Sequence, residues 1–527
     1  MNDTNKFTLL KKEPTNSLKK QLNNAIRTIN AVKNSLGFKQ LIGHFQPGYI
    51  YGNPKIHKNI QNPPLRPIIS QIGTPTYNVA KQINRIIMPY MNKKFMVEST
   101  YDVINILKTH NEYKILASLD VVNLFTNVPV HETIDLILQR VYHHENLAPP
   151  AHLSKEILKQ LLITCTTKTP FKNIDGKLYY QKEGVSMGSP LGPVFANFFM
   201  SHLENEILPN LENKPKLYLR YVDDTLLLVD NIEQLHTIKN AFNEKSVLEF
   251  TSEIQKNNSL NFLDTTISFE NGKYVTKIFS KPTATDDYIN YLGICPDRYK
   301  TGVVKTLLHR AYHVSPTWSV FHQEITNIKQ ALMNNNFPIS IIDKTINSFI
   351  TNKLNPDTTS TKEIIKLFYK NQMSNNYKQE EKTLRKIIQT HVKPTHMNNE
   401  IKLEIFYKNK KLKNLVIKNN CHPRTNDAGV VYQFNCKEAG CSSSYIGYTT
   451  NILRDRINQH LYNGSIKDHM LAVHNEIVTH EIINNTKILS RKQTKQELLI
   501  NEALLIKDIK PEINIQSQSF TNILKIF

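Results

Sequence analysis

The chain has 527 residues, which is more than one compact core normally holds and favours about two to four domains. Apolar residues make up 40% of the chain, so disorder is excluded as its main state. The 66 Lys and Arg residues outnumber the 45 Asp and Glu residues and give a formal net charge of +21, which favours a polyanionic partner such as nucleic acid. An anionic membrane is the weaker alternative, because the sequence has no apolar run long enough to cross a bilayer and no lipidation motif.

The N-terminus and the cysteines indicate a reducing compartment. The first 20 residues lack the apolar core of a secretory signal. Five cysteines are too few, and odd in number, for a disulfide framework. Three of them, Cys421, Cys436 and Cys441, lie close together near the C-terminus, which suggests a metal site.

The first part of the chain is basic and then alternates between apolar strand-like runs and helical patterns. Residues 18–36 space apolar side chains at helical intervals with lysines between them, which predicts an amphipathic basic helix. Residues 51–70 are rich in proline and basic residues, which predicts an extended, turn-rich, cationic segment. The candidate strands are 113–119, 217–230 and 260–270, and the candidate helices are 134–144, 152–164 and 193–208. This pattern predicts an α+β fold with a largely antiparallel sheet.

The region that follows is expected to be helical and then linker-like. Residues 318–355 carry two amphipathic patterns separated by NNNFP, which predicts two helices. Residues 356–400 are rich in Asn, Lys, Thr and Gln and predict a linker with one helix, at 380–391. Residues 401–417 are expected to form a small hairpin around their lysines.

Two separated segments carry aspartates next to apolar strands. Asp120 ends the run YKILASLD, and Asp223 and Asp224 are predicted at the tip of a hairpin formed by LYLRYVDDTLLLVD. Aspartates in turns are common and usually have no chemical role. If Asp120 and Asp223 meet on adjacent strands, however, their oxygens form a site for two hard divalent cations.

A glycine-rich loop lies between these two segments. In KEGVSMGSPLGPVFANFFM, residues Gly184, Gly188 and Gly192 allow the backbone to approach a ligand closely before a helix begins. Alone, such a loop is weak evidence for a site.

Taken in order, these segments resemble the reverse transcriptase family. In DVVNLF, the resemblance makes Asp120 a metal ligand and Phe125 an aromatic gate against a ribose 2′-OH. In YVDD, it makes Asp223 a metal ligand and Asp224 its support. The segment MGSPLGP, which contains Gly188, resembles the template-and-nucleotide loop, although Met187 and Gly192 differ from the Gln and Ser of many relatives.

The same resemblance extends to residues that would contact the nucleotide. FLD (262–264) and KPT (281–283), which contains Lys281, match later palm segments. Arg66 and Lys55 resemble the triphosphate-binding residues of the fingers, and an Arg fork suits phosphate on physical grounds.

The C-terminal region predicts a hairpin followed by two helices. Residues 429–447 hold two short apolar runs, ending in Tyr432 and beginning at Tyr445, on either side of a polar loop. The helix that follows carries Arg456 and His460 on one face, and a later helix carries Glu497 and Glu502 and ends before Pro511. Individually, such residues are usually packing or surface residues.

As a set, these residues resemble the GIY-YIG endonuclease family, with VVY in place of GIY. The resemblance implies that Tyr432, Tyr445, Arg456 and His460 surround the scissile phosphate. It assigns the single divalent metal to Glu502, with Glu497 as second choice, and Asn514 matches a family asparagine.

Four Cys and His residues near this region have the spacing of a structural zinc site. Cys436 and Cys441 precede His469 and His474, and both pairs fall within the usual ligand spacing. The alternative is a pair of free thiols and two surface histidines. We predict that zinc would clamp the nuclease core without contacting DNA.

A reverse transcriptase followed by a GIY-YIG domain resembles the Penelope-like retroelement proteins, whose polymerase is similar to that of telomerase. The resemblance implies an α+β multidomain protein, a right-hand polymerase joined to a small α/β nuclease. It divides the chain into fingers and palm (1–285), a helical thumb (286–356), a linker with a basic helix and a hairpin (357–420) and a nuclease domain with the zinc site (421–527).

The resemblance also implies cofactors and partners. They are Mg²⁺ or Mn²⁺ at both active sites, structural Zn²⁺, template RNA, primer or target DNA, and dNTPs, with no membrane. The protein is expected to assemble with RNA in the cytoplasm and to act in the nucleus, extending nicked DNA along its own RNA. The alternatives are a domesticated telomerase-like role and an inactive nucleic-acid-binding protein, and the latter is disfavoured because Asp120, Asp223, Asp224 and Glu502 are all present.

Overall fold

The computed structural model describes most of the chain in several segments. The described residues are 6–31, 36–56, 59, 61–355, 363–393, 399–408, 427–438, 440–492 and 495–514. The strands are β1 (Phe7–Leu10), β2 (Gly48–Pro54), β3 (Leu65–Ser70), β4 (Ile115–Val121), β5 (Phe171–Lys172), β6 (Leu178–Gln181), β7 (Leu217–Tyr221), β8 (Asp224–Val229), β9 (Phe250–Ile254), β10 (Ser259–Phe262), β11 (Thr265–Glu270), β12 (Lys273–Ile278), β13 (Glu363–Gln372), β14 (Asn399–Lys408), β15 (Ala428–Asn435), β16 (Ser444–Ile452) and β17 (Thr486–Arg491). The helices are α1 (Thr15–Asn30), α2 (Pro75–Ile87), α3 (Thr100–Leu107), α4 (Leu124–Asn127), α5 (Val130–Tyr142), α6 (Lys155–Thr166), α7 (Gly192–Ile207), α8 (Ile232–Lys245), α9 (Asp297–Val314), α10 (Trp318–Asn334), α11 (Ile339–Leu354), α12 (Tyr377–His391), α14 (Leu453–Tyr462), α15 (Ser465–His474) and α16 (Lys495–Ile509).

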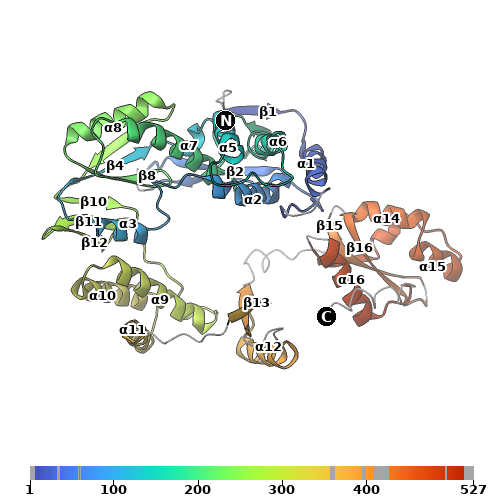
Figure 1. Cartoon of the computed structure of the whole chain (residues 1–527). Helices are drawn as coiled ribbons and strands as arrows, with labels where there is room; N and C mark the ends of the chain where they lie inside the picture. Colours follow the sequence, from blue (N-terminus) through green and yellow to red (C-terminus); the bar gives the residue numbers. More distant parts are fainter. Residues whose placement is uncertain are drawn as a thin grey trace.

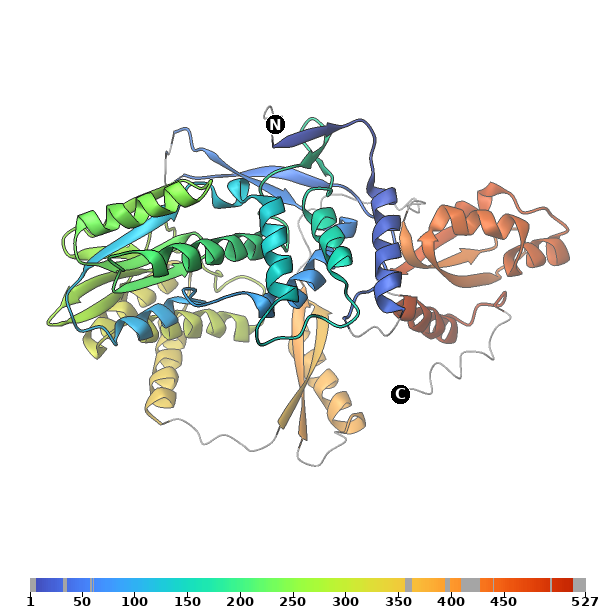
Figure 2. The ribbon, with the colours of Figure 1, turned by 45° about the horizontal axis from the view of Figure 1, so that its top comes forward.

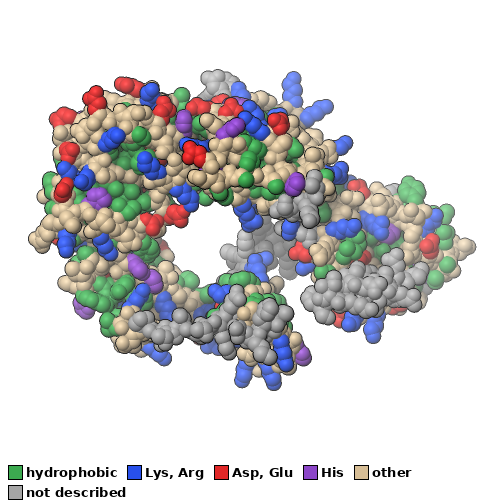
Figure 3. Space-filling view, in the orientation of Figure 1, with side chains coloured by type: hydrophobic (Ala, Val, Ile, Leu, Met, Phe, Trp, Pro, Cys, Tyr) green, Lys and Arg blue, Asp and Glu red, His purple; other side chains and the backbone are tan. Residues whose placement is uncertain are grey.

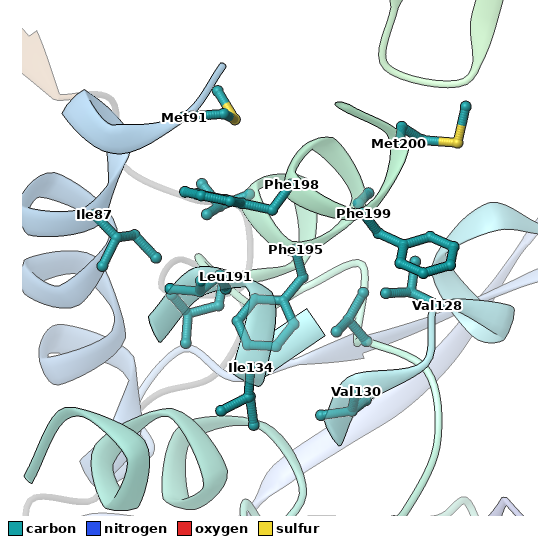
Figure 4. Close-up of a cluster of buried hydrophobic side chains, with 14 of the residues drawn as sticks. Ile87, Met91, Val128, Val130, Ile134, Leu191, Phe195, Phe198, Phe199 and Met200 are labelled. Atoms are coloured by element: carbon teal, nitrogen blue, oxygen red, sulfur yellow. The ribbon is translucent and has the colours of Figure 1, made fainter. Parts of the chain in front are cut away.

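The central unit is a four-stranded sheet of order β7-β8-β4-β9, in which every neighbouring pair is antiparallel, as predicted. Helix α7 packs inside this unit because its sequence is apolar on nearly all sides. In Figure 4, Phe195, Phe198 and Phe199 leave α7 in different directions, toward Ile134, Met91 and Val128. Burying aromatic rings on several sides of one helix fixes its position against the sheet.

Two further sheets, one of five strands and one of three, belong to the same part of the chain. The first has the order β1-β6-β5-β2-β3 and contains the β2–β3 hairpin, so residues 51–54 and 65–70 of the predicted extended segment belong to it. The second has the order β10-β11-β12. The predicted single strand 260–270 is wrong, because the chain reverses between Phe262 and Thr265, where Leu263 has a left-handed φ of 54°.

Helices α9, α10 and α11 form a separate bundle with its own core, which includes Leu308, Phe321 and Ile342. The two predicted helices of residues 318–355 are present as α10 and α11. Helix α9 lies within the helical thumb expected at 286–356, but the apolar pattern alone did not indicate it, because many of its side chains are charged or polar. Figure 1 shows this bundle below the sheet β10-β11-β12.

The predicted linker contains a strand–helix–strand unit. Strand β13 pairs with β14 in parallel, and α12 connects them, so the predicted helix at 380–391 lies within α12. In the small hairpin predicted for 401–417, the described residues 401–408 belong to β14, which pairs with β13. Residues 409–417 lie outside the described part.

The C-terminal unit is a three-stranded antiparallel sheet of order β16-β15-β17 with helices α14, α15 and α16. Alternation along β15 directs Val430, Tyr432 and Phe434 to one face of the sheet and Val431 to the other, where Leu498 of α16 covers it. Figures 1 and 2 both show this unit apart from the central sheet.

Figure 3 shows an opening bordered by the central unit, the α9–α11 bundle and the β13–β14 unit.

Among the described helices, none combines the length and the hydropathy that a membrane span requires.

Candidate active site

Three aspartates meet at one end of the central sheet. Asp120, near the end of β4, is the register partner of Asp224, the first residue of β8. Asp223 precedes Asp224 in the tight turn from β7, whose last residue, Tyr221, pairs with Asp224. Both Asp223 and Asp224 were predicted at the tip of the hairpin, but the tip consists of Val222 and Asp223, and Asp224 is already part of β8.

The electrostatics of this cluster fit a cation. Burial, followed by the nearby charges of Asp223 and Asp120, raises the pKa of Asp224 to about 6, and Lys281 partly offsets this rise. Carboxylates held this close repel one another unless a positive charge lies between them. The donor set consists of hard oxygens, which is the type that Mg²⁺ prefers.

A buried ion pair supports the turn that carries Asp223. The guanidinium of Arg220, which is fully buried, forms a salt bridge with Glu204 of α7. The same guanidinium donates hydrogen bonds to the side chain of Asn197 at 2.7 Å and to the carbonyl of Val222 at 3.0 Å. Val222 has a φ of 59°, which is strained for a β-branched residue, so this hydrogen bond helps to hold the tip.

Neither Arg220 nor Glu204 was predicted from the sequence. The available signal was a charged residue inside the apolar run LYLRYV and a glutamate within the apolar pattern of α7. Charged residues are almost never fully buried unless they are paired, so each position predicted a partner without identifying it.

The glycine-rich loop packs between Phe125 and β3. The backbone N–H of Val185 donates to the carbonyl of Phe125 at 2.6 Å, and the hydroxyl of Ser186 donates to the carbonyl of Ile69 at 2.7 Å. A Cβ on Gly188 would overlap that same carbonyl of Ile69. Gly188 is therefore required for close backbone packing, and the loop links half-buried Phe125 to the hairpin β2–β3.

The three predicted basic contacts lie in different surroundings. Lys281 is close enough to Asp224 to lower its pKa. Lys55 and Arg66 are near the end of the hairpin at which the connecting loop joins β2 to β3, where Arg66 pairs with Asn53 and is exposed. Within the described residues, no contact joins Lys55 or Arg66 to the aspartates.

In the C-terminal unit, two tyrosines, an arginine and a histidine surround one point. The hydroxyl of Tyr432 lies 2.7 Å from Nε2 of His460, and Nε of Arg456 donates to the same hydroxyl at 3.3 Å. The rings of Tyr445 and His460 are 5.5 Å apart. A Cβ on Gly447 would lie 2.8 Å from the Tyr432 hydroxyl oxygen, so only glycine leaves room for this arrangement.

A buried glutamate lies beside this cluster. Burial raises the pKa of Glu502 to about 7, and the backbone of Tyr448 and the charge of Arg456 partly offset the rise. Burial and Arg456 lower the pKa of His460 to about 4, so this imidazole is neutral at pH 7. Glu497, the second choice for a ligand, is exposed on α16.

The four predicted Cys and His side chains come together at one end of the unit. The ligand atoms of Cys436, Cys441, His469 and His474 all lie within 4.8 Å of one another. Sγ of Cys436 lies 3.4 Å from Nε2 of His474, and Sγ of Cys441 lies 3.5 Å from Nε2 of His469. Two thiols and two imidazoles at this range match the ligand chemistry of structural zinc. Cys421 lies outside the described residues.

Asn514 has a structural role in the described geometry. Its side chain exchanges hydrogen bonds with the backbone of Ile446, accepting from the N–H at 2.8 Å and donating to the carbonyl at 2.7 Å. These bonds attach the segment after α16 to β16, beside Tyr445.

Comparisons with solved structures give similarities at low identity. The chain is similar to apo telomerase from Candida tropicalis truncated from its C-terminal domain (16% identity, 47% of this chain, 58% of that chain, TM-score 0.32). It is also similar to telomerase from Candida albicans in complex with the TWJ fragment of telomeric RNA (13%, 60% of this chain, 61% of that chain, 0.41). A third is the Sicinivirus 3Dpol RNA-dependent RNA polymerase (12%, 62% of this chain, 71% of that chain, 0.40). The chain thus spans about three fifths of each of these two telomerase chains.

Comparison with family models is more direct. No curated protein matches the chain significantly. The model of the animal helix-turn-helix domain matches residues 287–347, which include α9 and α10. The model of reverse transcriptase (RNA-dependent DNA polymerase) matches residues 15–294, more than half of the chain, and spans all three aspartates of the central sheet. The chain therefore belongs to the reverse transcriptase family.

Proposed function

We propose that this chain is an RNA-directed DNA polymerase that extends a DNA primer along an RNA template. The observation that carries this proposal is the register pairing of Asp120 with Asp224, with Asp223 in the adjoining turn. Three carboxylates at one end of the sheet form a donor set for divalent cations.

Asp120 and Asp223 would hold Mg²⁺ or Mn²⁺, and Asp224 would support them. When bound, two such ions activate an attacking hydroxyl and stabilise a leaving oxygen. Phe125, behind the glycine-rich loop, would restrict space beside the sugar and so favour dNTPs. Lys281 would add positive charge next to the carboxylates, and Arg66 and Lys55 would contact the triphosphate.

A primer-extension assay tests this proposal. Purified protein should incorporate dTTP on a poly(rA) template with an oligo(dT) primer and Mg²⁺. Asp223→Asn, which keeps size and removes charge, should abolish incorporation. Asp230→Asn is the matched control. Asp223 comes directly before β8 and Asp230 directly after it, and Asp230 forms an ion pair with Lys114 on the surface. Equal incorporation by Asp223→Asn would overturn the assignment.

We further propose a linked DNA-nicking endonuclease, as in Penelope-like retroelement proteins. Supporting it are the Tyr432–His460–Arg456 cluster and the buried Glu502 beside it. Glu502 would hold a single divalent metal, which polarises a phosphate when bound. Arg456 would offset negative charge on the phosphate, and a tyrosine would orient or deprotonate water.

The two activities together would support target-primed reverse transcription. A nick would provide the primer end that the polymerase extends along the element's RNA. Such a role requires access to chromosomal DNA, so we propose nuclear action. A domesticated telomerase-like protein is the alternative, and it would have no use for nicking.

A nicking assay on supercoiled plasmid tests the second activity separately. Glu502→Ala should remove nicking and leave primer extension intact. Glu497→Ala, on an exposed turn of the same helix, should retain both activities. If Glu497→Ala lost nicking while Glu502→Ala retained it, the choice of Glu502 as the metal ligand would be contradicted.

We also propose that Cys436, Cys441, His469 and His474 hold structural Zn²⁺. Their convergence within 4.8 Å supports this proposal. Four protein ligands complete the tetrahedral shell of zinc, which is typical of a structural site, whereas a catalytic site keeps one position for water or substrate.

A further inference from the structure

The strand–helix–strand unit between the polymerase and the C-terminal unit has two different faces. Residues of β14 with odd numbers face α12: Leu403 and Ile405 are buried, and the hydroxyl of Tyr407 donates to Glu381 at 2.9 Å. Residues with even numbers face away, because side chains alternate along a strand. The even-numbered face is therefore the open side of a two-stranded parallel sheet.

Two aromatic rings lie in the middle of this open face. Phe368 of β13 is 69% exposed and Phe406 of β14 is 49% exposed. Their ring centroids are 5.9 Å apart with an interplanar angle of 31°, so they form one apolar platform. Exposing two adjacent phenylalanines is unfavourable in water unless a ligand covers them.

Lysines surround these rings on the same face. Lys366 and Lys370 flank Phe368 along β13. All three residues have even numbers, so their side chains lie on the face of the sheet opposite α12. Lys370 is also the register partner of Phe406 on β14, and Lys408 follows Phe406 on the same face. Glu404, the register partner of Phe368, lies on this face and forms an ion pair with Lys402 at 3.3 Å, and Glu400 lies on the same face. Four lysines against two glutamates leave the face positive.

We propose that this face binds single-stranded nucleic acid, with bases stacked on Phe368 and Phe406 and phosphates near Lys366, Lys370 and Lys408. Exposed aromatic rings set among basic side chains on a sheet form a stacking platform that accepts any base. Duplex nucleic acid does not fit this chemistry, because its bases are already stacked. The face adds a binding surface to the proposed polymerase and does not depend on either active site.

The positive charge of the face also favours nucleic acid over an apolar protein as its partner. A surface that docks an apolar partner is typically depleted of lysine at its centre. Here, lysines are immediate neighbours of both rings, and each ring can stack on a base while a lysine contacts the adjacent phosphate.

The test uses the full chain with its proposed polymerase site occupied by a chain-terminated primer–template duplex of mixed sequence. Binding of a short fluorescent oligoadenylate is then measured by anisotropy, with RNA, DNA and duplex versions as separate arms. We expect the RNA or DNA single strand to bind and the duplex to bind more weakly. Phe368→Ala combined with Phe406→Ala should weaken single-strand binding by at least about tenfold for each ring removed.

Matched variants separate stacking from charge and from folding. Ile387→Ala, an exposed position on α12, should leave binding unchanged. Lys366→Gln combined with Lys370→Gln should reduce the slope of log affinity against log salt by roughly 0.7 for each phosphate that the protein no longer neutralises. Melting curves should match those of the unaltered chain, and primer extension by the phenylalanine variant on a preformed duplex should be retained.

Several outcomes would overturn the inference. Unchanged single-strand binding in the phenylalanine variant would do so, as would equal binding of the duplex. A dimer that dissociates in that variant would assign the face to a second copy of this chain. Asp223→Asn should bind the oligonucleotide normally, so a failure of the proposed polymerase activity and a failure of this surface give different results.

Discussion

Asp120 and Asp224 are direct register partners on β4 and β8, so two carboxylates face each other across adjacent antiparallel strands. Residues on opposite strands at such a position are close enough for their charges to interact strongly. Because Asp223 adds a third charge, the free protein contains a cluster that is unfavourable by itself and suited to cations.

This pairing predicts a pH dependence of stability. The folded-state pKa of Asp224 is raised to about 6 from 3.8, so the unfolded chain releases this proton first as pH rises. Stability should therefore fall between about pH 4 and pH 6 and stay lower above that range. Asp224→Asn should remove this loss and stabilise the metal-free protein at pH 8 by about 1 kcal/mol, after discounting for the partial exposure of the group. Urea denaturation at pH 4 and pH 8 in EDTA measures the effect, and the variant should show no advantage at pH 4.

The Arg220–Glu204 pair should be separable into a folding role and a positioning role. Arg220→Met alone leaves Glu204 buried without its partner and should cost about 3–5 kcal/mol. Adding Glu204→Leu should restore most of the stability. The double variant should still have a lower kcat, because Val222 then lacks the guanidinium that holds the turn of Asp223.

The measurements for this pair are urea denaturation and steady-state primer extension. The drop in kcat should exceed any change in the KM for dTTP, since the turn positions Asp223, whereas the proposed contacts to the triphosphate come from Lys55 and Arg66. A double variant with unaltered kcat would show that the pair serves folding alone.

Gly188 should not tolerate even the smallest side chain. Gly188→Ala brings a Cβ onto the carbonyl oxygen of Ile69, and backbone atoms cannot yield as a flexible side chain can. We expect a loss of about 1–3 kcal/mol in stability and a large loss of primer extension, because the loop must shift away from β3. Gly302→Ala is the control: Gly302 lies within α9 with open space around it, so alanine should be neutral or stabilising. Equal activity in both variants would contradict tight packing of the loop.

Zinc should be needed for the folding of the C-terminal unit and not for the folding of the polymerase. Elemental analysis should find about one zinc per chain, lost in Cys436→Ser, because metal-binding free energy contributes directly to folding. The variant should lose nicking and show a lower melting transition for this unit, while primer extension continues. Cys295→Ser should keep its zinc, since Cys295 lies outside the cluster. Full zinc content in Cys436→Ser would exclude Cys436 as a ligand.

The local pattern of the sequence determined many elements of this protein. The antiparallel strands around Asp120 and Asp223, the hairpin of Tyr432 and Tyr445 and the helices after it follow from hydrophobic periodicity and turn chemistry, which act between near neighbours. The Cys436–Cys441 and His469–His474 spacings were likewise visible, because metal ligands usually come in short-range pairs.

Only the tertiary structure decided which distant residues meet. The burial of Arg220 against Glu204, the contact of Gly188 with Ile69 and the parallel pairing of β13 with β14 join residues from different elements. Periodicity indicates that a strand exists but not which strand it pairs with, and this is why the pairing of β14 with the distant β13 was not predicted. The open face with Phe368 and Phe406 was hidden for the same reason: a residue on a strand can be called exposed only after its sheet partners and covering helix are known.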